Sequence, residues 1–196
     1  MGSENILPGI SLKDENKQLE NIIDIAQENL DNARRSVEKL NEDLSDLREV
    51  YDAQDKEGLV LWNNAAAQLE ENKRNVLRCE KARKKPYFGR IDFKDPKQKD
   101  EEAYYIGRVG IAKNASEPVV IDWRAPIASV YYENSLGPCK YTVSSEGTFE
   151  IDLKRKRTYE IADDKLVDFF DSDVVANDEL LTKYLAKNKK AVLGEI

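Results

Sequence analysis

The segment from Val119 to Ile127 holds the residues of this 196-residue chain that are best suited to build a polar site. Asp122 and Arg124 flank Trp123 directly after an apolar run, and Pro126 follows them. A carboxylate and a guanidinium at this spacing can form an ion pair that packs on the indole face. The same residues can instead form a structural corner at the end of a strand. On the residues alone the corner is the simpler interpretation.

A second group with possible chemistry is a run of four cations: Lys154, Arg155, Lys156 and Arg157. Such a run can touch a phosphate backbone, and binding of that kind depends strongly on salt. Charges on an edge strand also discourage unwanted strand pairing, which is the more common reason for them. Both interpretations stay open, and the second is favoured.

Other kinds of chemistry are excluded by what the sequence lacks. It has no His, which removes zinc clusters and triads that depend on His. It also has no Gly-x-x-x-x-Gly-Lys-Ser/Thr phosphate loop and no Gly-x-Ser-x-Gly elbow. Cys79 and Cys139 are separate thiols, which we expect to stay reduced. We therefore predict no catalytic residue and no metal site in this chain.

The composition limits the kinds of partner. The net charge of -7 argues against holding duplex DNA by its phosphates and favours a protein with a basic surface. No run of about 18 apolar residues and no signal peptide occurs, so we expect a cytoplasmic protein without a membrane contact. Apolar residues make up 40% and charged residues 35%, which favours an elongated element over one compact core.

Two long helices are predicted in the first half of the chain. No Gly or Pro interrupts residues 11–54, and Ser11 supplies an N-cap. The second helix follows a turn within residues 51–58 and ends before Pro86, with a poorer seam because Asn72 falls on it. The first heptad seam is Leu19, Ile23, Ala26, Leu30, Ala33, Val37, Leu40, Leu44, Leu47 and Tyr51, and the second is Trp62, Ala65, Leu69, Val76 and Cys79.

Charge is unevenly distributed along this predicted arm. From Asp14 to Glu57 there are 14 acidic residues against six basic, whereas residues 78–90 hold six basic residues against one acidic. A solvated exterior is the common explanation for such blocks. The alternative is a probe whose acidic end, with Asp52, Asp55 and Glu57, enters a basic cavity. Residues 11–24 overhang the pairing and need cover from the base or from a late helix.

A small, mostly antiparallel β domain is predicted after the arm, so the fold class is α+β. We divide the chain into a flexible N-terminus (1–10), an antiparallel coiled-coil arm (11–85), the β domain (86–172) and a C-terminal helix (173–196). The predicted strands are short alternating runs at residues 87–93, 103–112, 119–121, 128–132, 141–143, 148–153 and 158–161.

Three motifs resemble the N-terminal region of the HelD-type branch of UvrD/Rep-like superfamily 1 helicases. They are Pro86 to Phe93 with Tyr87, Phe88, Gly89 and Arg90; Tyr105-Ile106-Gly107; and Ile121 to Tyr132 with Asp122, Trp123, Arg124 and Pro126. The cations at 154–157 follow in the expected order. The resemblance implies structural or interdomain roles for these motif residues.

The same resemblance implies an ATP-driven parent protein that binds bacterial RNA polymerase. Its helical hairpin would enter the polymerase secondary channel, with Asp52, Asp55 and Glu57 at the partner-binding tip, and help release nucleic acid. ATP and Mg²⁺ are expected for the intact protein and no cofactor for this chain, which ends before any phosphate loop. We expect a fragment that is monomeric and inactive alone. The alternative function is a DNA-contacting accessory region of a repair-type helicase.

Overall fold

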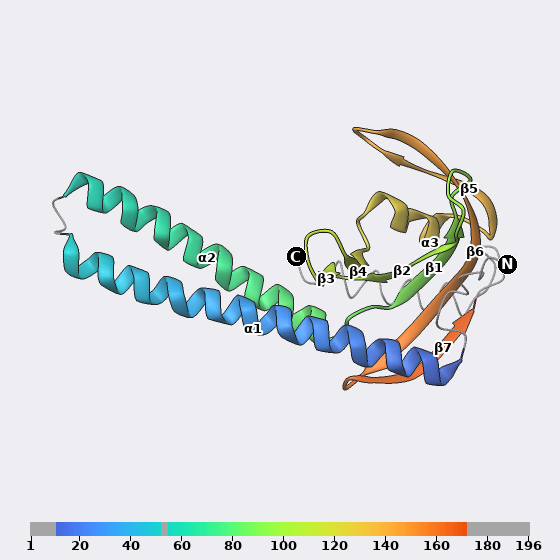
Figure 1. Cartoon of the computed structure of the whole chain (residues 1–196), viewed down its shortest axis with the longest axis horizontal. Coiled ribbons are helices and arrows are strands. Elements are labelled where there is room, and N and C mark those ends of the chain that lie inside the picture. Colours follow the sequence, from blue (N-terminus) through green and yellow to red (C-terminus); the bar gives the residue numbers. More distant parts are fainter. Residues whose placement is uncertain (1–10, 52–54, 172–196) are drawn as a thin grey trace.

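The computed structural model describes residues 11–51 and 55–171. Figure 1 shows a long helical hairpin that projects from one side of a curved sheet. The hairpin consists of α1 (Leu12–Val50) and α2 (Lys56–Lys84). The α+β fold predicted from the sequence is confirmed, and the expected turn between the helices lies where the heptad pattern stops.

Both helices begin and end at residues whose chemistry favours a boundary. The Ser11 side chain accepts a hydrogen bond from the Asp14 backbone N–H at 3.2 Å, which caps α1. The Asp55 side chain caps α2 in the same way, accepting from the Glu57 N–H at 3.0 Å. The α2 helix ends at Lys84, shortly before Pro86, which cannot donate a backbone hydrogen bond.

The apolar side chains between the two helices are buried in the middle of the hairpin and more exposed toward the tip. Leu30, Ala33 and Leu44 are buried on α1 and Leu69 on α2, whereas Trp62 is exposed. The weaker seam predicted for α2 is therefore confirmed. An exposed ion pair between Arg34 and Glu80, at 3.1 Å, adds only a small stabilisation to the pairing.

The base is a seven-stranded mixed sheet in the order β3-β4-β2-β1-β6-β5, with β7 paired to β6. Only β2 and β4 are parallel, so the predicted mostly antiparallel sheet is confirmed. The short helices η1 (Pro126–Ala128) and α3 (Ser129–Glu133) lie between β4 and β5. The strands are β1 (Gly89–Lys94), β2 (Glu102–Gly107), β3 (Ile111–Ala112), β4 (Pro118–Asp122), β5 (Gly137–Val143), β6 (Gly147–Ala162) and β7 (Lys165–Asp171).

Two apolar cores use different side chains of the base. One packs α3 against the sheet through residues such as Ile91, Val130 and Leu153. The other packs Leu19 and Ile22 of α1 with the base. The overhanging start of α1 is therefore covered by the base, one of the two covers that the sequence allowed. Full burial of each such side chain contributes about 1.5–3 kcal/mol.

Several strand predictions were wrong. Residues 128–132 are helical and not a strand: Ala128 ends η1 and the others lie in α3, because Pro126 opens a helical turn. Residues 148–153 and 158–161 belong to one strand, β6, because β1 pairs with the cations between them. Residues 103–112 split at the turn after Gly107 into β2 and β3. The predicted C-terminal helix lies outside the described residues.

The close approach at Gly107 gives a first prediction. A Cβ there would lie 2.4 Å from the Pro86 carbonyl oxygen and 2.9 Å from Val120 Cγ1, so Gly107→Ala forces backbone apart. We expect it to lower the free energy of unfolding by about 1–3 kcal/mol, measured by urea denaturation. Gly110→Ala is the matched control, since its nearest neighbour would be 3.6 Å away. Equal stability of the two variants would contradict the close packing.

Candidate functional site

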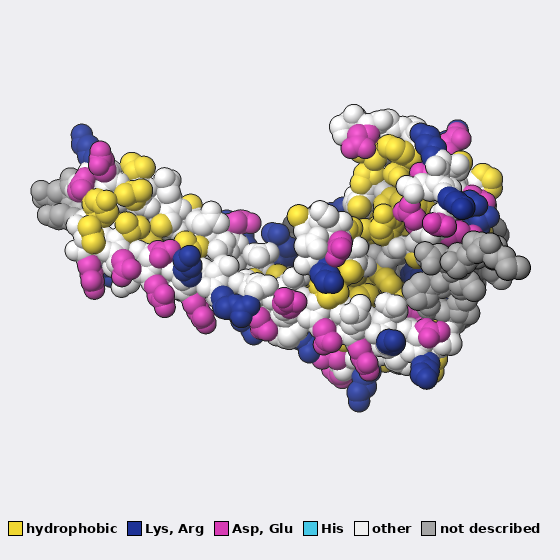
Figure 2. Space-filling view, in the orientation of Figure 1, with side chains coloured by type: hydrophobic (Ala, Val, Ile, Leu, Met, Phe, Trp, Pro, Cys, Tyr) yellow, Lys and Arg dark blue, Asp and Glu magenta, His cyan; other side chains and the backbone are white. Residues whose placement is uncertain are grey.

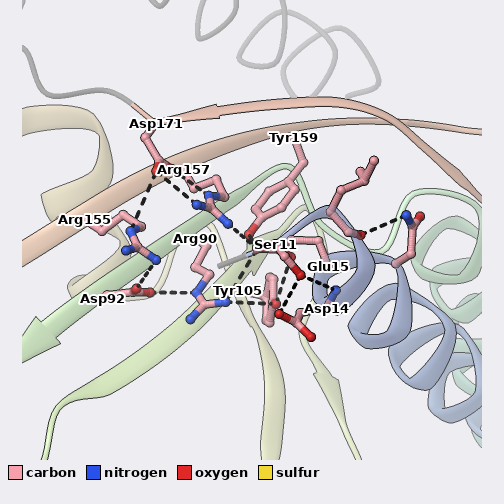
Figure 3. Close-up of polar contacts among 12 residues, drawn as sticks. Ser11, Asp14, Glu15, Arg90, Asp92, Tyr105, Arg155, Arg157, Tyr159 and Asp171 are labelled. Atoms are coloured by element: carbon pink, nitrogen blue, oxygen red, sulfur yellow. Dashed lines mark hydrogen bonds and ion pairs between the residues drawn. The ribbon is translucent and has the colours of Figure 1, made fainter. Parts of the chain in front are cut away.

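The site that joins the arm to the base is built around Glu15, a carboxylate with 0% exposure in the first turn of α1. Its Oε1 accepts hydrogen bonds from Arg157 Nη1 and from the Tyr159 hydroxyl, both at 2.7 Å. Its Oε2 accepts from the Tyr105 hydroxyl at 3.2 Å, and Arg90 Nη1 lies 3.7 Å from Oε1. Figure 3 shows these groups converging on the helix.

Two further acidic residues, Asp92 and Asp171, hold the arginines. Asp92 accepts from Arg90 Nε at 2.6 Å and lies 3.3 Å from Arg155 Nη1. Asp171 accepts from Arg157 Nε at 2.6 Å and from its Nη2 at 3.0 Å. We call this set the anchor network: Glu15, Arg90, Asp92, Tyr105, Arg155, Arg157, Tyr159 and Asp171. It balances three carboxylates against three guanidiniums and joins α1 to β1, β2, β6 and β7 (Figure 3).

The network keeps its tyrosines neutral and its arginines charged. Burial and the Glu15 carboxylate raise the pKa of Tyr105 to about 12 despite the opposing effect of Arg90. Burial, Tyr105 and Glu15 raise the pKa of Tyr159 further. Hydrogen bonds that Arg157 donates to Asp171 raise the pKa of Arg157. Two phenols thus remain donors to Glu15 at every physiological pH, which satisfies a buried carboxylate on both oxygens.

Sequence reasoning missed the centre of this network. Glu15 lies in the first turn of α1, where an acidic side chain favours the helix dipole and is commonly exposed. One signal pointed to the buried face: Glu15 lies four residues before Leu19 and so extends the apolar seam toward the N-terminus. An acidic residue on a seam needs a cationic partner, and the network supplies it.

The four cations at 154–157 do not form an exposed patch. Arg155 and Arg157 belong to the anchor network, and Lys156 is buried with its ammonium donating to the Tyr131 and Asn134 carbonyls. Burial lowers the pKa of Lys156. Lys154 is exposed and pairs with Asp152. Arg157 pairs with both β1 and β7, whereas residues 154–156 lie between the part of β6 that pairs with β5 and the part that pairs with β7. The edge role of the cations and their contact with nucleic acid stay predictions.

The Asp122–Arg124 pair forms as expected, at the surface. Asp122 accepts from Arg124 Nε at 2.9 Å and from Nη2 at 2.7 Å, while 70% of the Arg124 side chain is exposed. Burial alone would raise the pKa of Asp122, but the hydrogen bonds from Arg124 outweigh it and lower the pKa. The Trp123 ring meets Tyr132 edge-on, and Pro126 opens η1. This arrangement is a rigid corner with an accessible guanidinium.

The first motif links the arm to the sheet. Tyr87 and Phe88 enter the two different cores. The Phe88 backbone bonds to Ile106 and Tyr159, both at 2.9 Å. A Cβ on Gly89 would lie 2.8 Å from the Tyr131 ring. These contacts, with Arg90 in the anchor network, fix the direction in which the chain leaves α2.

Only part of the acidic site expected at the arm tip lies within the described residues. Asp55 and Glu57 are exposed at the start of α2, where Asp55 also serves as the helix cap. Asp52 lies outside the described residues. No three Asp, Glu or Cys side chains within residues 11–51 and 55–171 come together in a way that suits a metal ion. Over the same ranges, neither long helix is apolar enough to cross a membrane.

The anchor network gives a second prediction. Glu15→Gln leaves two buried guanidiniums without their shared carboxylate, and we expect it to lower the free energy of unfolding by about 3 kcal/mol. Urea denaturation followed by circular dichroism measures this. Glu20→Gln is the control, because Glu20 is an exposed acidic residue further along α1. It is expected to change stability by less than about 0.5 kcal/mol. A loss in Glu15→Gln no larger than in the control would refute the network.

Comparison with known protein families identifies the kind of module that this geometry represents. Residues 12–185 match the family described as DNA helicase IV HelD, N-terminal domain. The match includes the arm, the anchor network and every strand of the base. No curated protein sequence matches the chain. The match indicates a helicase-associated N-terminal module, and the chain belongs to the HelD N-terminal domain family.

Proposed function

We propose that the chain is the RNA-polymerase-binding module of an ATP-dependent superfamily 1 helicase-like motor. Its arm inserts into the polymerase secondary channel and helps to release nucleic acid and recycle the enzyme. The observation that carries this proposal is a projecting hairpin fixed to its base by a fully buried carboxylate. A hairpin that is merely exposed to solvent, with no partner to reach, would not need such an attachment.

The dimensions of the arm suit insertion. The 39 residues of α1 extend about 58 Å at 1.5 Å per residue, and the outer part of the hairpin projects past the base in Figure 1. Contacts at the root add to the anchor network: Arg83 bonds to Gln27 at 2.7 Å and to Asp164 at 2.6 Å. These contacts couple the root of the arm to the base. A motor that turns the base would therefore move the tip.

The charge of the arm suits a channel with basic walls. Acidic side chains line one edge of the hairpin in Figure 2. On α1 beyond the base these include Glu38, Glu42, Asp43, Asp46 and Glu49, all exposed. Opposite charge along a channel raises the rate of entry and disfavours nucleic acid as a competitor.

We propose ATP and Mg²⁺ for the intact parent protein. The chain has no phosphate loop, and its described residues offer no carboxylate cluster for a metal ion. We therefore assign no step of ATP hydrolysis to these residues. Their part is to hold the arm and to transmit movement.

The alternative is a DNA-contacting accessory region. It would use Lys154 with Lys84 and Lys85 at the arm root, all exposed. The burial of Lys156 and Arg157 weakens this alternative, because two of the four expected cations are occupied inside the protein. A salt titration separates the two functions. Oligonucleotide binding that falls steeply with salt would favour the alternative, and polymerase binding without oligonucleotide retention would favour the arm.

The acidic tip gives a third prediction. We expect the combined variant Asp52→Asn, Asp55→Asn and Glu57→Gln to weaken binding to core RNA polymerase about tenfold at low salt. Asn keeps the helix cap at position 55, so the loss reports charge and not unfolding. Fluorescence anisotropy of the labelled chain measures the affinity.

The control variant removes three charges from α1 near the base: Glu20→Gln, Asp24→Asn and Glu28→Gln, all at exposed positions. It is expected to bind with an affinity close to that of the unmodified chain. Unchanged affinity and unchanged nucleic-acid release in the tip variant would remove the acidic tip from the mechanism.

A further inference from the structure

The tip of the arm carries an apolar surface that the sequence analysis did not single out. Residues 58–69 contain no charged side chain, in a helix that is otherwise rich in charge. We define the tip patch as Val50, Leu59, Val60, Leu61 and Trp62, which are 74%, 53%, 58%, 44% and 36% exposed. Figure 2 shows hydrophobic side chains gathered next to the end of the hairpin.

The tip patch is not explained by pairing of the two helices. Successive residues of a helix are 100° apart, so the four apolar residues from Leu59 to Trp62 point in nearly all directions around α2. A single partner helix can cover only part of them. Contiguous exposed apolar surface is a mark of interaction sites in soluble proteins.

The patch is supported by Tyr51, the C-cap residue of α1, which packs against the start of α2. Gly58 is buried, and a Cβ on it would lie 2.5 Å from Tyr51 Cβ, so the tyrosine lies directly against the start of α2. Leu47, Tyr51, Leu59 and Trp62 then line a hollow between the ends of the two helices. A preformed surface loses little conformational entropy on binding.

Charge at the border of the patch selects the occupant. Asp46, Glu49, Asp55 and Glu57 are exposed around it, with Arg48 and Lys56 as the described cations nearby. A second copy of the chain would bring two acidic borders together, which opposes self-association through this surface. A protein whose apolar pocket is bordered by Lys and Arg would meet both parts of the tip.

We infer that the tip patch docks into an apolar pocket with a basic border on the partner protein, and that this contact holds the arm in place. The inference rests on the proposed function, in which that partner is RNA polymerase. The acidic border guides entry, and the apolar side chains determine how long the arm stays. Apolar side chains at the centre of a contact commonly carry most of its affinity.

The test compares binding of the full chain to core RNA polymerase for neutral variants. Val60→Gln with Leu61→Gln keeps helix propensity and charge while removing apolar surface. We expect at least about a tenfold loss of affinity, as for hot-spot residues. The loss should persist at high salt, unlike the effect of removing the tip acids. The matched control is Leu77→Gln with Val167→Gln, which are 58% and 59% exposed outside the patch.

Circular dichroism and thermal melting verify that each variant is folded. Val50→Gln provides a second test from α1 if the double variant melts early, and it is expected to weaken binding as well. Unchanged affinity of folded patch variants, with a wild-type chain that binds, would overturn the inference and leave the proposed function intact. A wild-type chain that does not bind polymerase would overturn both. Light scattering that shows a dimer lost in the patch variant would also overturn it, by assigning the patch to a second copy.

Discussion

The structure depends on one buried carboxylate. Removing an ionised group such as Glu15 from water costs several kcal/mol unless hydrogen bonds and opposite charge replace the solvent. Here Arg157, Tyr159 and Tyr105 supply these bonds, and Asp92 and Asp171 hold the arginines in place. The requirement fixes the register of α1 against the sheet, because no shift of a residue along the helix would satisfy the same partners.

This constraint decides how the arm can act. The apolar contacts of Leu19 and Ile22 supply much of the attachment energy, but apolar contacts alone tolerate sliding and rotation. Directional hydrogen bonds do not. The start of the arm is thus held at a defined angle to the base, which determines where the exposed residues at its far end are presented.

The sequence predicted the fold class and the arm because each signal was local. The seam from Leu19 to Tyr51, the loss of pattern before Gly58 and the stop at Pro86 are all readable within a few residues. The burial of Glu15 and of some of the cations at 154–157 could not be predicted from the sequence. It depends on contacts between residues about 140 positions apart, such as the hydrogen bond of 2.7 Å from Arg157 to Glu15. The helix α3 was missed because its buried Val130 and Tyr131 have strand-like side chains.

The contact proposed for the tip combines two kinds of recognition that act over different ranges. Acidic groups act at a distance and lose strength with salt, whereas the tip patch acts only in contact. The central claim is that this end of the arm enters a channel of RNA polymerase. The most direct test places a photo-crosslinking amino acid at position 60 of the tip and, separately, at position 140 on the β5–β6 hairpin. The account predicts crosslinks from position 60 to residues that line the secondary channel and none there from position 140. Crosslinks from position 60 only to the outer surface of polymerase, or to nucleic acid, would contradict it.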